Sequence, residues 1–290
     1  MKNKNILITG GKGFIGSYLV EDLSKDNNVK VFDIQDGKDI KDFEILKREL
    51  KNVDVVFHLA GLISVEESMR KPLDYIENNI VGSYNLLKAA SETGVKKIVF
   101  ASSASVYGDY PENPKKEDTL MIPKSPYAFA KITVERLMDK FNGNELKTVS
   151  LRFFNIYGPR QKLNSSYAAV IPIFISKALN NEDLTIDGDG NQTRDFIYIE
   201  DIVSACILAA EKGSGVFNIG SGKPISINDI AKMIIELTGS KSKIRHVENR
   251  AGDIVHSLSD ISKAKDTLGF EPKYDIRAGL KKTIEWFKNQ

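Results

Sequence analysis

The chain has 290 residues, of which 41% are hydrophobic and 28% charged, and its formal net charge is +2. These values are typical of a soluble globular protein of one large or two ordinary domains, with enough apolar material for a core. The small net charge argues against a broad nucleic-acid surface, and no uninterrupted apolar stretch is long enough to cross a membrane. A single cysteine, Cys206, and three scattered histidines give no metal-ligand spacing. Cys206 lies in apolar sequence, which predicts a buried thiol in a reducing, cytoplasmic compartment.

Short β-branched runs alternate with amphipathic stretches over the first two thirds of the chain. The runs are continuously apolar, which is typical of strands covered by helices on both faces. The alternation predicts an α/β fold with a Rossmann-type, doubly wound parallel sheet. The expected strands are 5–9, 29–33, 53–59, 97–102, 148–154 and 216–219. The expected helices are 15–24, 43–50, 73–93, 126–141, 169–180, 199–211 and 227–238.

The pattern changes after about residue 160, where Gly, Asn, Asp and Pro become frequent and the expected strands become short. We therefore expect a nucleotide-binding domain at 1–160 and a smaller α/β lobe at 161–290, packed on the carboxyl edge of the sheet. Segments within 195–220 look like core elements that return to the first domain.

A glycine-rich turn directly follows the first expected strand. Gly10, Gly13 and Gly16 lie between that strand and the first expected helix, where backbone amides and a helix N-terminus can bind a pyrophosphate. The next strand ends in Asp33, at the offset of about 20 residues where a carboxylate accepts hydrogen bonds from a ribose diol. Asp33 would also repel a 2′-phosphate. The pattern therefore predicts a site for NAD rather than NADP.

Two further segments are candidates for contacts with the nucleotide. Asp39 and Ile40 could contact the adenine, although spacing alone supports an ordinary loop almost equally well. The segment 58–61 ends the third expected strand, and we interpret His58 as a structural residue rather than a base. Small residues that allow close approach of the nucleotide follow it: Leu59, Ala60 and Gly61.

Tyr127 and Lys131 stand four residues apart at the start of the expected helix 126–141, so both project from one face. Because a free tyrosine has a pKa of ~10, it needs a neighbouring cation to act as a base near neutral pH. Lys131 and the positive nicotinamide ring could together lower that pKa, and the hydroxyl of Ser103 could bind the substrate oxygen and relay the proton. The spacing taken alone also fits an ordinary amphipathic helix with a solvated Lys131.

These motifs together resemble the extended short-chain dehydrogenase/reductase family, in the nucleotide-sugar epimerase branch typified by UDP-glucose (UDP-galactose) 4-epimerase. The likeness covers nearly the whole chain and is more specific for the superfamily than for one sugar. It comprises residues 9–16, 58–61, 78–80, 102–108, 125–131, 151–160, 194–198, 217–222 and 250–253.

The resemblance implies NAD as the cofactor and a UDP-sugar as the substrate. Tyr127 would take the proton of the sugar 4-hydroxyl while the C4 hydride passes to NAD, and the 4-keto sugar would then turn over and take the hydride back on its opposite face. The implied catalytic residues are Ser103, Tyr127 and Lys131. The implied cofactor contacts are Gly10, Gly13, Phe14, Ile15, Asp33, Asp39, Ile40, Leu59, Ala60, Gly61, Asn79, Ser102, Tyr127, Lys131 and Phe154. The implied substrate contacts are Ser103, Tyr127, Asn155, Thr185, Arg194, Arg250, Asp253 and Ser257, with both arginines on the diphosphate.

Two departures bear on the reaction and the sugar. Ala104 and Ser105 stand where related dehydratases and decarboxylases carry acidic residues, which disfavours those reactions. Ser257 stands where the family gates the sugar 2-position, and its small side chain predicts that UDP-hexoses and UDP-N-acetylhexosamines are both accepted. The expected activity is thus 4-epimerisation of UDP-glucose with UDP-galactose and of the two N-acetyl analogues.

Two alternatives stay open. One is an epimerase or reductase of another nucleotide sugar, such as UDP-glucuronate or a UDP-pentose. The other, with less support, is a non-catalytic NAD-sensing protein on the same fold, since such proteins typically lose the tyrosine–lysine pair. The resemblance also implies a homodimer formed through the helices expected at 73–93 and 126–141.

Overall fold

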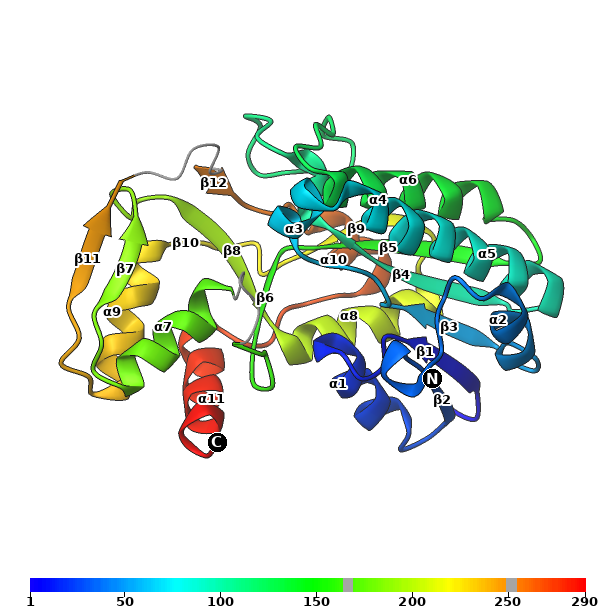
Figure 1. Ribbon diagram of the computed structural model, residues 1–290, viewed down its shortest axis with the longest axis horizontal. Coiled ribbons are helices and arrows are strands. Elements are labelled where there is room, and N and C mark those ends of the chain that lie inside the picture. The colour runs from blue at the N-terminus through cyan, green and yellow to red at the C-terminus, as the bar shows by residue number, and fades with distance from the viewer. Residues whose placement is uncertain (164–168, 249–254) are drawn as a thin grey trace.

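The computed structural model describes residues 1–163, 169–248 and 255–290, and its centre is a six-stranded sheet in the order β2-β1-β3-β4-β5-β9. All neighbouring strands in this sheet are parallel. They are β1 (Asn5–Thr9), β2 (Asn28–Phe32), β3 (Val55–His58), β4 (Lys97–Ser103), β5 (Lys147–Phe153) and β9 (Gly215–Ile219). Helices cover both faces (Figure 1), which confirms the predicted Rossmann-type fold.

The two faces of the sheet carry separate groups of helices. Along β1, Ile6 and Ile8 belong to one apolar core and Leu7 belongs to the other, so successive side chains are buried on opposite faces. This two-sided burial explains why the strands are continuously apolar in sequence. One face is covered by α1 (Phe14–Leu23) and α8 (Ile199–Lys212), and the other by α2 (Phe43–Glu49), α5 (Gly82–Thr93) and α6 (Pro126–Phe141).

The single helix expected at 73–93 is wrong in detail, because three segments share that range. They are α4 (Pro72–Tyr75), a π-helical segment η2 (Ile76–Val81) and α5. A π-helical turn is rare and often accompanies a functional site, and a spacing of apolar residues does not distinguish it from an α-helix. Helices that the sequence analysis did not delimit are α3 (Val65–Arg70), α10 (Ser262–Leu268) and α11 (Ile276–Lys288).

Short strands after β5 build the smaller region. β8 (Thr193–Tyr198) pairs with β6 (Asn155–Tyr157), β10 (Pro224–Ser226) and β12 (His256–Ser257) in a mixed sheet. β7 (Leu184–Asp187) and β11 (Ile244–Val247) form a parallel pair, beside α7 (Val170–Leu179) and α9 (Ile227–Thr238) (Figure 1). The chain crosses between the regions more than once, since β8 belongs to the small sheet and β9 to the large one. The division into domains at residue 160 stays a prediction.

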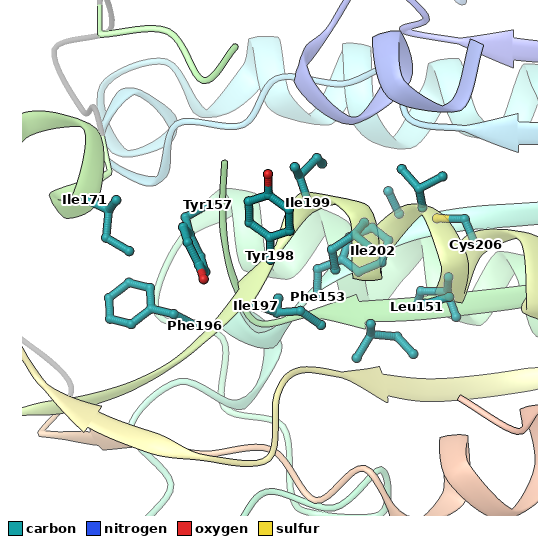
Figure 2. Packing of buried hydrophobic residues seen from close by; sticks show 14 of the residues in the cluster. Leu151, Phe153, Tyr157, Ile171, Phe196, Ile197, Tyr198, Ile199, Ile202 and Cys206 are labelled. Carbon is teal, nitrogen blue, oxygen red and sulfur yellow. The ribbon is translucent and has the colours of Figure 1, made fainter. Parts of the chain in front are cut away.

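One apolar core joins the two regions. Figure 2 shows Leu151 and Phe153 of β5 near Ile202 and Cys206 of α8, with Tyr157 and residues of β8 continuing toward α7. Cys206 is fully buried and reduced, and burial raises the pKa of its thiol, as expected of a core residue. Among the residues described, no helix has the length and apolar character of a membrane span.

Candidate active site

A cavity of about 640 Å³ lies at the carboxyl ends of the strands of the large sheet. Ligands of open α/β sheets bind at this edge, because the loops that follow neighbouring strands diverge there. The topology brings residues from widely separated parts of the chain, between residues 10 and 154, to the wall of this cavity. The individual role of each residue stays a prediction. The predicted residues that line it are Gly10, Gly13, Phe14, Ile15, Asp33, Asp39, Ile40, Leu59, Ala60, Gly61, Ser102, Ser103, Tyr127, Lys131 and Phe154.

The glycine-rich turn packs too tightly for side chains. Gly10 has a φ of +70°, and a Cβ added to it would lie 2.8 Å from the backbone nitrogen of Ala60. A Cβ added to Gly16 would lie 2.2 Å from the carbonyl oxygen of Gly10. The turn therefore holds the start of α1 against the ends of β1 and β3. Backbone amides at such a helix N-terminus fit the pyrophosphate of a dinucleotide.

Asp33 is held in place at the end of β2 and is 5% exposed. Its Oδ2 accepts a hydrogen bond from the amide of Lys12 at 2.9 Å, and its Oδ1 accepts one from the amide of Gln35 at 3.0 Å. A carboxylate has about four lone-pair positions, so acceptors are left for the two hydroxyls of a ribose. The carboxylate thus fits the function predicted for it.

His58 connects the ends of β1 and β3 to the helical layer. Its Nδ1 is 2.8 Å from the hydroxyl of Thr9, and its Nε2 is 2.8 Å from the hydroxyl of Ser83. The hydroxyl of Thr9 accepts from the amides of Leu59 and Ala60 at 3.2 Å each, so it donates to His58. Burial lowers the pKa of His58 to about 3, and this neutral ring fits the structural role that the sequence predicts.

Asn79, a predicted cofactor contact, is absent from the walls of the cavity. It lies buried in η2, where its side chain accepts from the amide of Leu62 at 2.8 Å and donates to the carbonyl of Leu62 at 2.9 Å. A Cβ added to Gly61 would lie 3.1 Å from its Oδ1. Asn79 therefore fixes the loop that borders the cavity, and its neighbour Asn78 lines the cavity instead.

Tyr127 and Lys131 lie on the first two turns of α6, which begins with the hydroxyl of Ser125 accepting from the amide of Ala128 at 3.2 Å. Tyr127 is 9% exposed and Lys131 is 7% exposed. The Nζ of Lys131 donates to the carbonyl of Ala101 at 2.6 Å. The alternative of an ordinary helix with a solvated Lys131 is therefore wrong.

Burial dominates the electrostatics of this pair. It lowers the pKa of Lys131 to about 8, while the carboxylate of Glu135 acts in the opposite direction. Burial also raises the pKa of Tyr127, and its hydrogen bond with Ser103 offsets that shift only in part. The groups of the protein alone therefore do not produce the lowered tyrosine pKa that the sequence analysis expects. That expectation now depends on the positive charge of a nicotinamide ring.

A second cavity, of about 350 Å³, adjoins the first, because Ile156 of β6 lines both. Three predicted substrate contacts line it: Asn155, Thr185 and Arg194. The amide of Asn155 donates to the carbonyl of Asp195 at 3.0 Å, and the guanidinium of Arg194 donates to the carbonyl of Thr193 at 3.0 Å. The two cavities are thus neighbours that share one wall residue, with the first at the large sheet and the second in the smaller region.

The remaining predicted substrate contacts are placed only in part. Ser257 lies on β12, in register with Arg194 of β8, and it lines neither cavity. Arg250 and Asp253 lie outside the described residues.

Sequence reasoning missed several polar residues at the site. Gln161 lines the larger cavity, and its Oε1 is buried with no hydrogen-bond partner among the described residues, so it offers an acceptor to a ligand. Gln192 lines the smaller cavity. Glu135 and Arg152 form a buried ion pair beneath the site, at 2.7 Å. Two of them carried a signal: Glu135 follows Lys131 by one helical turn, and Arg152 lies in the 151–160 segment of the resemblance, which assigned it no role.

Comparison with known proteins places the chain among nucleotide-sugar enzymes. The model of the NAD dependent epimerase/dehydratase family matches residues 6–220. The UDP-N-acetylglucosamine 4-epimerase of Methanobrevibacter ruminantium, solved with UDP-N-acetylmuramic acid, is 41% identical with a TM-score of 0.94, and each chain is covered to 100%. The UDP-glucose 4-epimerase of Thermotoga maritima, solved with UDP-glucose, is 38% identical with a TM-score of 0.93, covering 98% of this chain and 99% of its own.

A relative with a different reaction is equally similar. The UDP-N-acetyl-alpha-D-glucosaminuronate decarboxylase of Bacillus cytotoxicus is 39% identical over 320 residues, which cover 98% of each chain. Similarity therefore identifies the family and the class of substrate without choosing one sugar or one reaction. With the glycine turn, the placement of Asp33 and the full-length matches, the chain belongs to the NAD-dependent epimerase/dehydratase family, and its cofactor is NAD.

Proposed function

We propose that this protein is a UDP-sugar 4-epimerase that interconverts UDP-glucose and UDP-galactose and also accepts UDP-N-acetylglucosamine and UDP-N-acetylgalactosamine. The observation that carries the proposal is the buried pair Tyr127 and Lys131, which lines one cavity together with Ser103, beside a second cavity that shares Ile156 with the first. A tyrosine held in this way suits proton transfer at a sugar hydroxyl.

Each residue of the site has a distinct part in the proposed reaction. NAD, when bound, supplies an acceptor and donor of hydride. Tyr127 takes the proton from the sugar 4-hydroxyl and later returns it, while Ser103 holds the sugar oxygen by a hydrogen bond. Lys131 places a positive charge beside the phenolate, since its Nζ lies 5.6 Å from the centroid of the Tyr127 ring. Because the proton is returned, the residues end each turnover in the state in which they began.

The residues after Ser103 favour epimerisation over the reaction of the decarboxylase relative. Ala104 and Ser105 form the start of a 3-10 turn and carry no carboxyl group. Elimination and decarboxylation would need an additional acid, base or anion-stabilising group near the sugar, and neither residue supplies one. An epimerase needs none beyond the tyrosine.

The smaller cavity is the proposed site for the nucleotide part of the substrate. Asn155, Thr185 and Arg194 are proposed to contact it, with Arg194 on the diphosphate, where a guanidinium fork is suited to phosphate oxygens. We propose that Arg250 and Asp253 complete the contacts.

Ser257 is the proposed gate for the sugar 2-position. Ser257 lines neither cavity, so this proposal rests on the resemblance alone. A Ser257→Tyr variant should lose turnover of the N-acetyl sugars while it keeps turnover of UDP-galactose, because the longer side chain would occupy the space that an acetyl group needs. Full activity of this variant on UDP-N-acetylgalactosamine would show that Ser257 does not gate the sugar 2-position.

We also propose a cytoplasmic homodimer formed through the helical layer around α4 and α6. Apolar side chains are exposed there, including Leu73 at 69%, Ile76 at 39% and Phe129 at 52%. Light scattering should give the mass of a dimer for the wild type and that of a monomer for Leu73→Glu with Phe129→Glu, because buried charges oppose association. A variant with Leu120→Glu, which is also exposed at 58% but lies in the 108–125 loop, is the matched control.

The test of the activity uses the purified protein, without and with added NAD. UDP-galactose, UDP-N-acetylgalactosamine, UDP-glucuronate and UDP-xylose are incubated separately, and the sugar signals are followed by NMR. Conversion of the first two to their gluco epimers would support the whole proposal. Conversion of UDP-glucuronate or UDP-xylose alone would keep 4-epimerisation and change the sugar. Release of carbon dioxide, or no conversion at all, would contradict the proposal.

A further inference from the structure

A row of buried polar residues crosses the large sheet directly beneath the site. Ser102 of β4 is in register with Arg152 of β5, and Arg152 is in register with Asn218 of β9. The three are exposed by only 3%, 2% and 0%. Buried polar side chains need hydrogen-bond partners, and this row holds a guanidinium at its centre.

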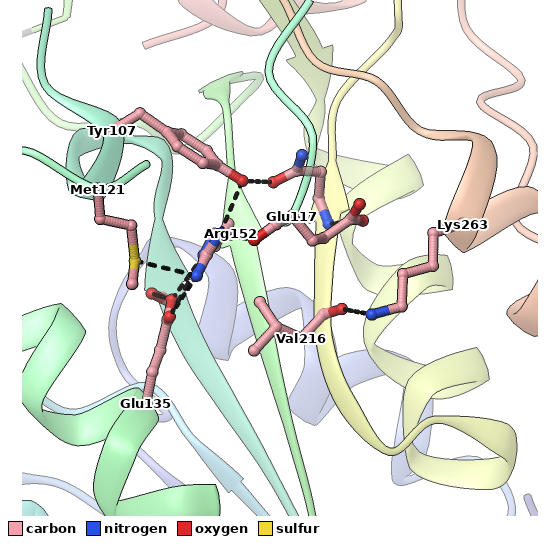
Figure 3. A network of polar contacts seen from close by, with 9 residues as sticks. Tyr107, Glu117, Met121, Glu135, Arg152, Val216 and Lys263 are labelled. Atoms are coloured by element: carbon pink, nitrogen blue, oxygen red, sulfur yellow. Dashed lines mark hydrogen bonds and ion pairs between the residues drawn. The ribbon is translucent and has the colours of Figure 1, made fainter. Parts of the chain in front are cut away.

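Arg152 is fully bonded at the centre of this row (Figure 3). Its Nε and Nη2 donate to the carboxylate of Glu135 at 3.0 and 2.7 Å, in the two-pronged geometry that suits a guanidinium. Its Nη1 donates to the hydroxyl of Tyr107 at 2.8 Å and to the carbonyl of Glu117 at 2.9 Å. Tyr107 in turn donates to the side chain of Asn218 at 2.6 Å. The guanidinium is therefore held by α6 through Glu135, by the 3-10 turn Ala104–Tyr107 through Tyr107, and by the 108–125 loop through Glu117.

Glu135 transmits this fixed position to the active site. The hydroxyl of Ser102 donates to its Oε1 at 2.5 Å. One helical turn before it, Lys131 donates to the carbonyl of Ala101, and one turn earlier again Tyr127 lines the same cavity as Ser103. Three successive turns of α6 thus lie beside three successive residues at the end of β4. Glu135 is the member of this series that is anchored to the interior of the sheet.

We propose that Glu135 and Arg152 are positioning residues of the active site. Their ion pair locks α6 to the end of β4, so that Tyr127, Lys131 and Ser103 keep the mutual geometry needed for proton transfer. Neither residue lines a cavity, so neither touches substrate or cofactor. The inference rests on the proposed function where turnover is the readout, and on the fold alone where the phenol of Tyr127 is titrated directly.

The charge of Glu135 gives the positioning role a measurable effect on the titration of Tyr127 and Lys131. The ionisable groups that act on them are His58 from β3, Tyr75 from α4 and Glu135 from α6 itself. His58 has a pKa of about 3, and burial raises the pKa of Tyr75, so both are neutral at pH 7. Glu135 is thus the charged group among these three, and Arg152 is its partner.

Glu135→Gln is the main variant. It removes a negative charge near Lys131 and leaves the positive charge of Arg152 unbalanced, and both changes lower the pKa of neighbouring groups. The pH profile of kcat should move to lower pH on both limbs, by on the order of half a unit or more. We expect kcat to fall about ten- to a hundredfold through lost alignment, with little change in KM. A difference titration of the phenolate, against the same protein carrying Tyr127→Phe, should show the same downward shift.

Two other variants separate the anchor from the charge. Ser102→Ala removes the hydrogen bond to Glu135 without changing a charge, so it should lower kcat without moving the pH profile. Because Ser102 also lines the cavity, equilibrium binding of NAD is measured beside kcat, and the affinity for NAD should stay that of the wild type. The matched control is Thr148→Val, which removes the buried bond of 2.7 Å from Thr148 of β5 to the carbonyl of Met138 of α6, two turns away from Lys131. It should lower thermal stability and leave both kcat and the pH profile unchanged.

The outcomes discriminate between positioning and simple stability. If Glu135→Gln lowers only the melting temperature, as Thr148→Val does, the inference is overturned. If Glu135→Gln does not fold, Ser102→Ala and Tyr107→Phe carry the test, and wild-type kcat in both would overturn it. If the wild type turns over no UDP-sugar, the proposed function fails, and the phenolate titration still decides the inference: an unshifted Tyr127 would contradict it.

Discussion

Two buried lysines lie near the opposite ends of β4, and they are alike in several respects. Lys97 begins the strand and is 9% exposed, whereas Lys131 of α6 lies at its other end and is 7% exposed. Burial lowers the pKa of each to about 8. Each ammonium group donates to a backbone carbonyl, that of Gly213 for Lys97 and that of Ala101 for Lys131.

Their surroundings differ. Lys131 lines the 640 Å³ cavity beside Tyr127 and has the carboxylate of Glu135 one turn away. Lys97 bonds Gly213, the C-cap residue that follows α8, and lines neither cavity. Its register partner on β5 is Lys147, which carries a like charge. A perturbed pKa therefore does not identify a site by itself. What distinguishes Lys131 is its location at the carboxyl edge of the sheet, where loops diverge and leave a cavity that can hold a ligand beside the buried charge.

The largest effect that this comparison predicts is that of Tyr127→Phe. Loss of the phenol removes the proposed proton acceptor, so kcat should fall by about 10²–10⁴-fold. NAD should still bind, because the glycine turn and Asp33 are unchanged. Turnover of UDP-galactose by NMR and equilibrium binding of NAD measure the two properties. Turnover equal to that of the wild type would remove Tyr127 from the proposed chemistry, whereas NAD binding without turnover in the wild type would favour a non-catalytic, NAD-sensing role.

Replacement of each lysine by methionine should have different effects on activity at the two ends of β4. Lys131→Met removes the charge beside Tyr127, and we expect kcat to fall by about 10²-fold. Lys97→Met removes an equally buried charge far from the cavity, and its kcat should stay within about twofold of the wild type. The same assay at several substrate concentrations measures both. Similar losses in the two variants would mean that general loosening of β4, rather than position, governs activity.

The sequence predicts the carboxyl edge well because its signals are local. A strand, a glycine turn and a helix follow one another directly, and β1 begins and ends where expected. The spacing of Tyr127 and Lys131 likewise needs only one helix. Contacts that depend on strand register could not be predicted from the sequence, because no local pattern indicates that Ser102 and Arg152 are neighbours. Short strands were expected in the small region, but their pairing and most of their bounds were not predicted, since the pairing of two- to six-residue strands is decided by partners distant in sequence.

Between its pKa in the folded protein, about 8, and its ordinary value of 10.5, Lys97 binds fewer protons in the folded state than in the unfolded chain. Lys97 therefore increases the free energy of unfolding as the pH rises from about 8 to 10.5. Below pH 8 the lysine is charged in the folded protein, and the full cost of burying that charge is present. Relative to the wild type, Lys97→Met should be more stable at pH 7 than at pH 9.5. Chemical denaturation at the two pH values measures the difference.

Lys147 offers a way to tune this smallest effect. Its positive charge adds to the lowering of the Lys97 pKa, after burial. Lys147→Gln should therefore raise that pKa and narrow the window, so that the stability of this variant depends less on alkaline pH than that of the wild type. Activity should not change at either pH, because Lys147 lies at the amino end of β5, away from the cavity. An equal pH dependence in wild type and Lys147→Gln would show that burial alone sets the pKa of Lys97.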